Sequence, residues 1–179
     1  IIGFTVGTLC FQNKNSASFM LGVCDIFQTF PSFVYLIPVM MLFGITDTSV
    51  LIAVIVYATI PATRYTIEGL RSVPTALHDA ATMSGVTKFQ RLFKIEFPLA
   101  FPHMMLGLNQ TIVFALFMVI IGAFIGTEDL GQYILKALSD KNGAGIGLTL
   151  GLCVAFIGLI FDNLIRTWVD QRKKHLGID

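Results

Sequence analysis

The chain has 179 residues, of which 55% are hydrophobic and 13% are charged, and its formal net charge at pH 7 is +1. Soluble domains carry about a quarter charged residues, so this composition indicates a protein of the lipid bilayer and argues against a soluble globular domain. The sequence has no basic strip interleaved with aromatic residues, so nothing favours a nucleic-acid partner.

Five apolar stretches are predicted to cross the membrane as helices, since a crossing needs about 20 apolar residues. They cover residues 1–11, 17–43, 49–63, 99–125 and 146–165. Pro31 and Pro38 are expected to break the second stretch, which neighbouring helices can tolerate. The first stretch is partial and starts without Met, so we expect a chain cut within a helix of a longer protein. The expected fold is an all-α, multi-span helical bundle that forms one transmembrane domain over residues 1–179.

Positive charges are unevenly distributed between the loops. Residues 64–98 contain five Lys and Arg side chains, and residues 166–174 contain four more. The positive-inside tendency therefore places residues 64–98 and the C-terminus in the cytoplasm. Residues 127–145 should then face the periplasm, with a short surface helix from Asp129 to Leu138. This periplasmic loop could dock a receptor, or it could be an ordinary amphipathic connector.

The cytoplasmic segment, residues 72–98, is predicted to contain a polar helix. Ser72 and Pro74 are typical of a helix start, and Asp79 is then expected in the first turns, near the positive end of the helix dipole. Gly85 costs a helix about 1 kcal/mol relative to Ala, so we expect it where the backbone turns or where another group comes close. From these residues alone, the helix could also be an amphipathic one that lies on the membrane surface.

Seven residues of this segment stand at a distinctive spacing: Asp79, Ala80, Ala81, Gly85, Ile95, Phe97 and Pro98. The spacing resembles the EAA signature of membrane-spanning subunits of ABC importers, which reads Glu-Ala-Ala, three residues, Gly, nine residues, Ile, one residue, Leu-Pro. Asp79 replaces the usual Glu and Phe97 replaces the usual Leu. The resemblance implies a type I importer permease core in which this segment is a coupling helix that docks on a cytoplasmic ATPase.

Three further stretches are similar to permeases of the quaternary-amine branch, which import glycine betaine, choline and related osmolytes. They read QTFPSFVYLIPVMMLFGI (28–45), LNQTIVFALFMVIIGAFIG (108–126) and DLGQYILKAL (129–138). The resemblance implies a second permease copy, expected to form a homodimer, and a separate periplasmic or lipid-anchored receptor in the inner membrane system. It also implies that the chain performs no catalysis, because the partner ATPase binds ATP and Mg²⁺.

Polar and aromatic residues within the predicted spans are candidates for a translocation path, because polar groups in the hydrocarbon tend to face the bundle interior or a pathway. The candidates are Asp25, Gln28, Phe30, Tyr35, Asn109 and Gln110. The rings could attract a cationic substrate, although aromatic residues are common in any membrane helix. The alternative for the two amides on the fourth span is hydrogen bonding between helices, at about 0.6 kcal/mol each. Asp162 is expected to pair with Arg166 one turn away, and His78 is expected to be solvated.

Other function classes find less support in the sequence. An ion-coupled secondary transporter is the main alternative, but it gives no reason for the EAA spacing. A membrane-embedded hydrolase needs a nucleophile with a base, or a metal cluster. The cysteines, Cys10, Cys24 and Cys153, lie far apart without His or Cys at ligand spacing, so we expect packing roles for them and no metal or cofactor site.

Overall fold

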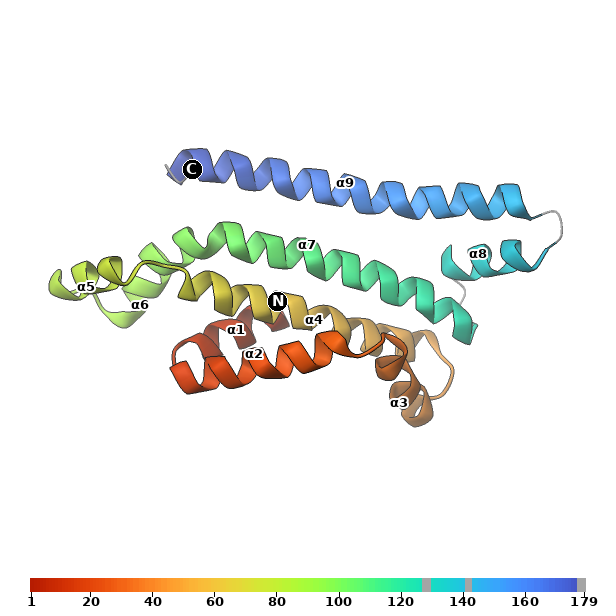
Figure 1. The fold of residues 1–179 in the computed structure, drawn as a ribbon, viewed down its shortest axis with the longest axis horizontal. Coiled ribbons are helices and arrows are strands. Elements are labelled where there is room, and N and C mark those ends of the chain that lie inside the picture. Colours follow the sequence, from red (N-terminus) through yellow and green to blue (C-terminus); the bar gives the residue numbers. More distant parts are fainter. Residues whose placement is uncertain (127–129, 141–142, 177–179) are drawn as a thin grey trace.

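The computed structural model describes residues 1–126, 130–140 and 143–176. The regular elements within these ranges are helical (Figure 1). In chain order they are α1 (Ile2–Phe11), α2 (Lys14–Thr29), α3 (Phe33–Phe43), α4 (Asp47–Arg71), α5 (Thr75–Met83), α6 (Lys88–Arg91), a π-helical turn (Leu92–Glu96), α7 (Phe97–Gly122), a 3₁₀ turn (Ala123–Ile125), α8 (Leu130–Ser139) and α9 (Ala144–Leu176).

Within the described residues, three helical rods are long and apolar enough to cross a membrane. They are α4, the continuous run from α6 into α7, and α9, and the pair α2 and α3 would make a fourth if it counts as one span. The predicted spans therefore correspond to helices, but most of the helices are longer. α4 extends to Arg71 where the sequence predicts an end at residue 63, and α9 runs to Leu176 where the prediction ends at residue 165.

The predicted span 17–43 consists of two helices. α2 and α3 are bent by 89° relative to each other, with Pro31 in the break between them. Phe30, the residue before this proline, has the extended backbone (φ −75°, ψ 135°) that proline imposes on its predecessor. The expected break at Pro38 is wrong, because Pro38 lies inside α3.

α4 and α7 form the centre of the bundle (Figure 1). α1, α2 and α3 pack against α4, and α9 runs antiparallel beside α7. Two clusters of buried residues hold these helices together. The first joins α2, α3, α4 and α7 around Leu36, Ala53 and Met118, and the second joins α4, α7 and α9 around Leu70 and Ala100.

α1 crosses α4 at a distance that permits no side chain on one face of α1. A Cβ at Gly7 would lie 2.6 Å from the Cβ of Thr66 and 2.9 Å from the carbonyl oxygen of Thr63. Gly3, one turn earlier, would place a Cβ 2.5 Å from that of Ala62. Small residues four apart are typical of helix pairs in membranes, since they bring the two backbones into van der Waals contact.

The segment after α4 folds differently from the prediction. Ser72 is the last capping residue of α4, with its hydroxyl donating to the Gly69 carbonyl at 2.8 Å, and it does not start the next helix. α5 begins at Thr75, directly after Pro74, so that Asp79 is its fifth residue. Asp79 therefore lies within the first turns of the helix, as predicted, but in the second of them, about one turn away from the positive end of the helix dipole.

Candidate functional site

α5 and α6 lie beyond the end of the α4–α7 bundle, at the same end of the molecule as the C-terminal part of α9 (Figure 1). α5 presents most of its surface to the outside: Leu77, Ala80 and Met83 are exposed, whereas Ala81 is buried. The two alanines of the motif are thus divided, with Ala81 packed inward and Ala80 facing out.

Apolar side chains collect on this exposed end. Met83 is 90% exposed and Phe89 is 70% exposed, and Leu77 is exposed six residues before Met83 on α5. We call the surface formed by Leu77, Ala80, Met83 and Phe89 the apolar tip. Exposed apolar patches of this kind mark sites of contact with a protein or a membrane.

A glycine turn ends α5. Gly85 has a left-handed backbone (φ +71°), and a Cβ at this position would meet no atom within 4 Å. The Gly85 N–H donates to the Thr82 carbonyl at 3.1 Å, and the Val86 N–H donates to the Ala81 carbonyl at 3.3 Å. These two bonds form a Schellman motif. Of the two roles considered for Gly85, a backbone turn and a close approach, the structure has the turn.

The chain returns to the bundle through α6 and the π-helical turn. A capping box starts α6: the Gln90 N–H donates to Thr87 Oγ1 at 3.3 Å and the Thr87 N–H donates to Gln90 Oε1 at 3.0 Å. Pro98 follows the π-helical turn in the first turn of α7. Its ring would clash with the carbonyl four residues earlier in a regular α-helix, which accounts for the widened turn before it.

The remaining motif residues lie where this return segment meets the bundle. Ile95, Phe97 and Pro98 are half-buried, and the Phe97 ring lies 5.2 Å from that of Phe93. Phe97 also packs against the second buried cluster. It therefore fills an apolar position, as expected for a replacement of Leu by Phe.

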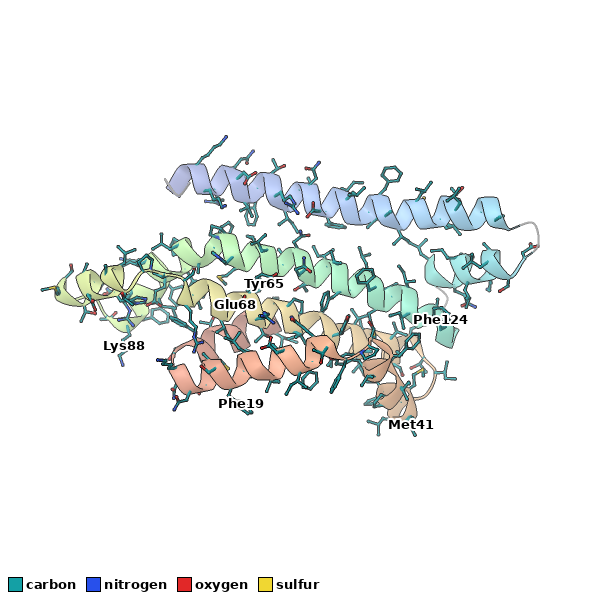
Figure 2. All side chains as sticks on the ribbon, in the orientation of Figure 1. Phe19, Met41, Tyr65, Glu68, Lys88 and Phe124 are labelled. Atoms are coloured by element: carbon teal, nitrogen blue, oxygen red, sulfur yellow. The ribbon has the colours of Figure 1, made fainter. Side chains whose placement is uncertain are left out.

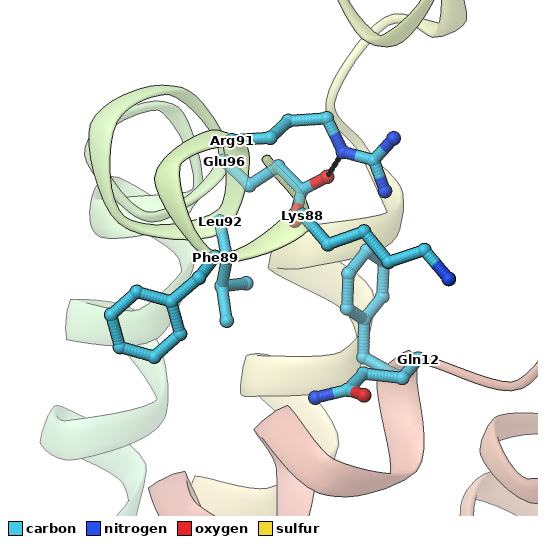
Figure 3. Close-up of a pocket in the computed structure, with 7 residues that line it drawn as sticks. Gln12, Lys88, Phe89, Arg91, Leu92 and Glu96 are labelled. Atoms are coloured by element: carbon cyan, nitrogen blue, oxygen red, sulfur yellow. Dashed lines mark hydrogen bonds and ion pairs between the residues drawn. The ribbon is translucent and has the colours of Figure 1, made fainter. Parts of the chain in front are cut away.

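Glu96 is the residue of this segment that the sequence analysis did not identify. It is 1% exposed, and its Oε1 accepts a hydrogen bond from Arg91 Nε at 2.9 Å (Figure 3). His78 Nδ1 lies 3.0 Å from the same oxygen. The expectation that His78 is solvated is therefore wrong, since it is half-buried and paired.

A pocket of about 350 Å³ opens beside this carboxylate, where the end of α1 meets α6. Figure 3 shows the Lys88 and Arg91 side chains from α6 and Gln12 from the end of α1 around it. Phe11, Phe89 and Leu92 complete the lining, so the pocket has both polar and apolar walls. Its only acidic lining residue is Glu96.

Two of the predicted path residues, Asp25 and Gln28, meet at Arg64 of α4. The Arg64 guanidinium donates to Asp25 Oδ1 and, at 3.1 Å, to Gln28 Oε1, and its Nε donates to Glu68 Oε1 at 3.0 Å. Arg64 therefore connects α2 with α4 through an ionic cluster within the bundle, although it was predicted to lie in the cytoplasmic loop.

A second polar pocket, of about 240 Å³, lies at this cluster between α2, α4 and α7. It brings together candidates from two of the predicted spans, because Gln28 and Gln110 both line it with Arg64. The rest of the lining consists of Pro61, Tyr65, Glu68 and Phe114. Figure 2 labels Tyr65 and Glu68 on α4 in the middle of the bundle.

Two other candidates for the translocation path, Tyr35 and Asn109, make contacts that hold helices together. Tyr35 is buried in the first cluster, its hydroxyl donates to the Phe27 carbonyl, and its ring lies 5.0 Å from that of Tyr57. Asn109 Nδ2 donates to Asp162 Oδ1 at 2.5 Å, which links α7 to α9 as the hydrogen-bonding alternative predicts.

The predicted Asp162–Arg166 pair is confirmed, with the closest contact at 2.8 Å. Phe30 is exposed just after α2, with its ring 6.2 Å from that of Phe27.

In the described part of the chain, no group of three or more His, Cys, Asp and Glu side chains could hold a metal ion. The cysteines differ in their surroundings: Cys24 is buried in the first cluster, whereas Cys153 is exposed on α9.

Comparison with known proteins gives consistent results. Residues 1–175 match the family model "Binding-protein-dependent transport system inner membrane component". The chain is 92% identical over 178 residues to the trimethylamine N-oxide transport system permease protein TmoV of Pelagibacter ubique, which covers 99% of the chain and 25% of TmoV. It is 36% identical over 173 residues to the glycine betaine/carnitine transport permease protein GbuB of Listeria monocytogenes, which covers 97% of the chain and 61% of GbuB. The chain thus spans about a quarter to three fifths of the length of these relatives.

A solved structure of the MetNI methionine ABC transporter, in an inward-facing conformation, superposes with a TM-score of 0.69 at 19% identity. The match covers 96% of this chain and 91% of the MetNI chain, so the fold is that of a type I importer permease. Together with the family match and the apolar helical rods, this similarity shows that the chain is an all-α, multi-pass membrane protein of the binding-protein-dependent transport system inner membrane component family.

Proposed function

We propose that the chain is part of the permease of an ATP-driven importer for trimethylamine N-oxide and related quaternary amines. Its 92% identity to a trimethylamine N-oxide permease supports this substrate, and the glycine betaine/carnitine relative supports the wider class. These solutes share a trimethylated nitrogen and a negatively charged oxygen. Choline, which the sequence resemblance also implies, lacks this negative oxygen and is a weaker candidate.

The permease performs no catalysis in this proposal. A cytoplasmic ATPase binds ATP and Mg²⁺, the apolar tip docks on it, and the permease bundle alternates between two arrangements. The observation that carries the proposal is the exposed α5, which bears the motif residues Asp79 and Ala80 and ends at the Gly85 turn. A helix with one buried residue, projecting from a packed bundle, is suited to seat in a groove of a partner.

This arrangement supports the orientation that we propose. The apolar tip, residues 72–98 and the C-terminus lie in the cytoplasm, in agreement with the Lys and Arg residues there, whereas Arg64 lies on α4 within the bundle. α8 lies at the opposite end of the bundle, where a periplasmic or lipid-anchored receptor would deliver the substrate (Figure 1). A second permease copy, identical in the simplest assembly, completes the path.

The pocket at Arg64 is our candidate for a segment of this path. Gln28 and Gln110 offer amide groups to the substrate oxygen, and the rings of Tyr65 and Phe114 offer faces to a methylated ammonium. Asp25 and Glu68 together carry one more charge than Arg64 balances, which favours a cationic group. Tyr35 and Asn109 are assigned to packing and helix pairing, and Phe30 stays a prediction.

The experiment that tests the coupling role is co-purification of the full permease with candidate ATPase subunits. Ala80→Asp places a charge on the apolar tip, and Gly85→Arg places a bulky residue in a left-handed conformation. Both variants should insert in the membrane and lose the ATPase. Gly85→Asn is the matched control, because Asn tolerates this backbone region. Full ATPase recovery with Ala80→Asp and Gly85→Arg would contradict the coupling role.

A second experiment tests the substrate. Vesicles that contain the full importer and its receptor should take up labelled trimethylamine N-oxide only with ATP, and unlabelled glycine betaine should compete. Gln110→Ala should raise the KM for uptake more than it lowers the maximal rate. Uptake that persists without the ATPase would contradict an ATP-driven importer.

A further inference from the structure

We propose that Glu96 is a positioning residue that joins α5 to α7, so that movement of the apolar tip is transmitted into the bundle. The inference rests on the coupling role proposed above and adds a residue outside the seven EAA positions. Glu96 is 1% exposed and contacts His78 of α5 at 3.0 Å and Arg91 of α6 at 2.9 Å. One carboxylate thus connects both outer helices to the start of α7.

α5 has few other attachments. Ala81 is its one buried residue. The hydroxyls of Thr82 and Ser84 donate to carbonyls of α5 itself. The His78–Glu96 contact links α5 to the start of α7. Among the described residues, no other side-chain hydrogen bond or ion pair joins α5 to another element. Movement of α5 relative to α7 therefore has to stretch or break this contact.

The π-helical turn creates the geometry of the second contact. Arg91 and Glu96 are five residues apart, and in a regular α-helix of 3.6 residues per turn such side chains point about 140° away from each other. The wider turn over Leu92–Glu96 brings them to the same face, where Arg91 Nε reaches Glu96 Oε1. α6 is therefore fixed in its rotation about the helix axis relative to α7.

Burial makes this junction stiff. A carboxylate removed from water is strongly destabilising when it loses a partner, so Glu96 favours the arrangement in which both His78 and Arg91 stay in contact. Stiff junctions between packed elements transmit rigid-body movement. A merely stabilising role for Glu96 predicts that the permease level, the ATPase rate and uptake fall together when the junction is broken. The positioning role predicts that uptake falls relative to ATP hydrolysis.

His78→Ala is the sharpest test, because it frees α5 and leaves Glu96 paired with Arg91. In the full permease, amide hydrogen exchange within α5 should accelerate about tenfold, the size expected for one lost hydrogen bond to a charged group, while exchange in α7 stays unchanged. In the assembled importer, solute transported per ATP hydrolysed should fall about fivefold or more, the usual lower range of a coupling interaction. Asp170→Asn is the control, because it changes an exposed carboxylate near the C-terminal end of α9, at the same end of the molecule as α5. It should alter neither the hydrogen exchange of α5 nor the solute transported per ATP.

Glu96→Gln provides a second variant that keeps the shape of the side chain and removes its charge. If His78→Ala assembles poorly, Glu96→Gln can replace it in both measurements, and the same two changes are expected. Unchanged transport per ATP in both variants overturns the inference, even if exchange in α5 accelerates. The proposed coupling role fails separately, by recovery of ATPase with Ala80→Asp and Gly85→Arg, so the two failures can be told apart.

Discussion

α4 buries 13 of its 25 residues, whereas α5 buries one of its nine. α4 is held by close packing against α1, α2, α3 and α7. α5 and α6 are held by a glycine turn, a capping box and the paired carboxylate of Glu96. The bundle is therefore stabilised by many weak packing contacts that act together. The apolar tip is stabilised by a few local interactions, each of which a single substitution can remove.

This difference fits the two tasks proposed for the chain. Dense packing in a membrane bundle needs small residues at the crossings, and it makes the bundle move in discrete steps. A docking helix has to leave its apolar side chains exposed for a partner, so it cannot be stabilised by burying them. Local hydrogen bonds and one ion-paired junction hold its position instead.

The largest effect is expected from filling the crossing of α1 and α4. Gly7→Leu forces the two backbones apart, and overpacking of this kind costs about 1–3 kcal/mol or more. Unfolding of the purified permease in detergent should show the loss. Gly151→Leu, at a position on α9 where a Cβ meets no atom within 4 Å, should cause no loss of stability. Equal effects of the two substitutions would mean that α1 does not pack on α4 as described.

Two Gly→Ala substitutions should have opposite signs. Gly85→Ala imposes a Cβ on a left-handed residue and should destabilise the end of α5 by about 1–2 kcal/mol. Gly22→Ala, in the open interior of α2, should stabilise that helix by about 0.5–1 kcal/mol. Hydrogen exchange of the two segments measures both effects. Stabilisation by Gly85→Ala would be incompatible with the Schellman turn.

Removal of the α6 cap should have a smaller, local effect. Thr87→Ala deletes the hydroxyl that accepts from the Gln90 N–H and should cost about 1 kcal/mol. Faster exchange should be confined to residues 88–91. Thr82→Ala is the control, because the Thr82 hydroxyl bonds back to the His78 carbonyl within α5. A change that spreads into α7 would show that α6 and the bundle do not behave as separate regions.

The smallest effect is expected for a polar contact inside the bundle. Asn109→Leu removes the hydrogen bond from α7 to Asp162 of α9, which should cost about 0.6 kcal/mol. Arg166 still pairs with Asp162 in this variant. Thr111→Val is the comparison, since the Thr111 hydroxyl donates to Gly107 within α7. A loss as large as that of Gly7→Leu would mean that polar contacts, rather than packing, dominate the bundle.

Much of the fold follows from hydropathy. The long apolar runs predict α4, α7 and α9, because length and composition are local properties of the sequence. Helix ends were predicted less well. Ser72 is a common starting residue, but here its hydroxyl caps the end of α4. Pro31 and Pro38 are the same residue type, yet the first lies in the break between α2 and α3 and the second lies inside α3, so the presence of proline alone does not predict where a helix ends.

The parts of the candidate site that depend on the spacing of residues along the sequence could be predicted. The EAA positions and the turn at Gly85 depend on neighbours within a few residues. The roles of Glu96 and His78 depend on a contact across 18 residues, and that of Arg64 on a contact with Asp25 on another helix. Glu96 did leave a faint signal, since a single acidic residue stands between Ile95 and Phe97 in an otherwise apolar and basic stretch.

The π-helical turn also constrains how this segment can change in length. Each residue of an α-helix advances the side chains by about 100°, so deletion of one residue between Leu92 and Ile95 would leave Arg91 and Glu96 four residues apart, on the same face of a regular α-helix. The Arg91–Glu96 contact could then form without the widened turn, whereas an inserted residue would turn Lys88–Arg91 further around the α7 axis. A single deletion in this stretch should accordingly be tolerated more readily than a single insertion, which would put the whole tip out of phase with its partner.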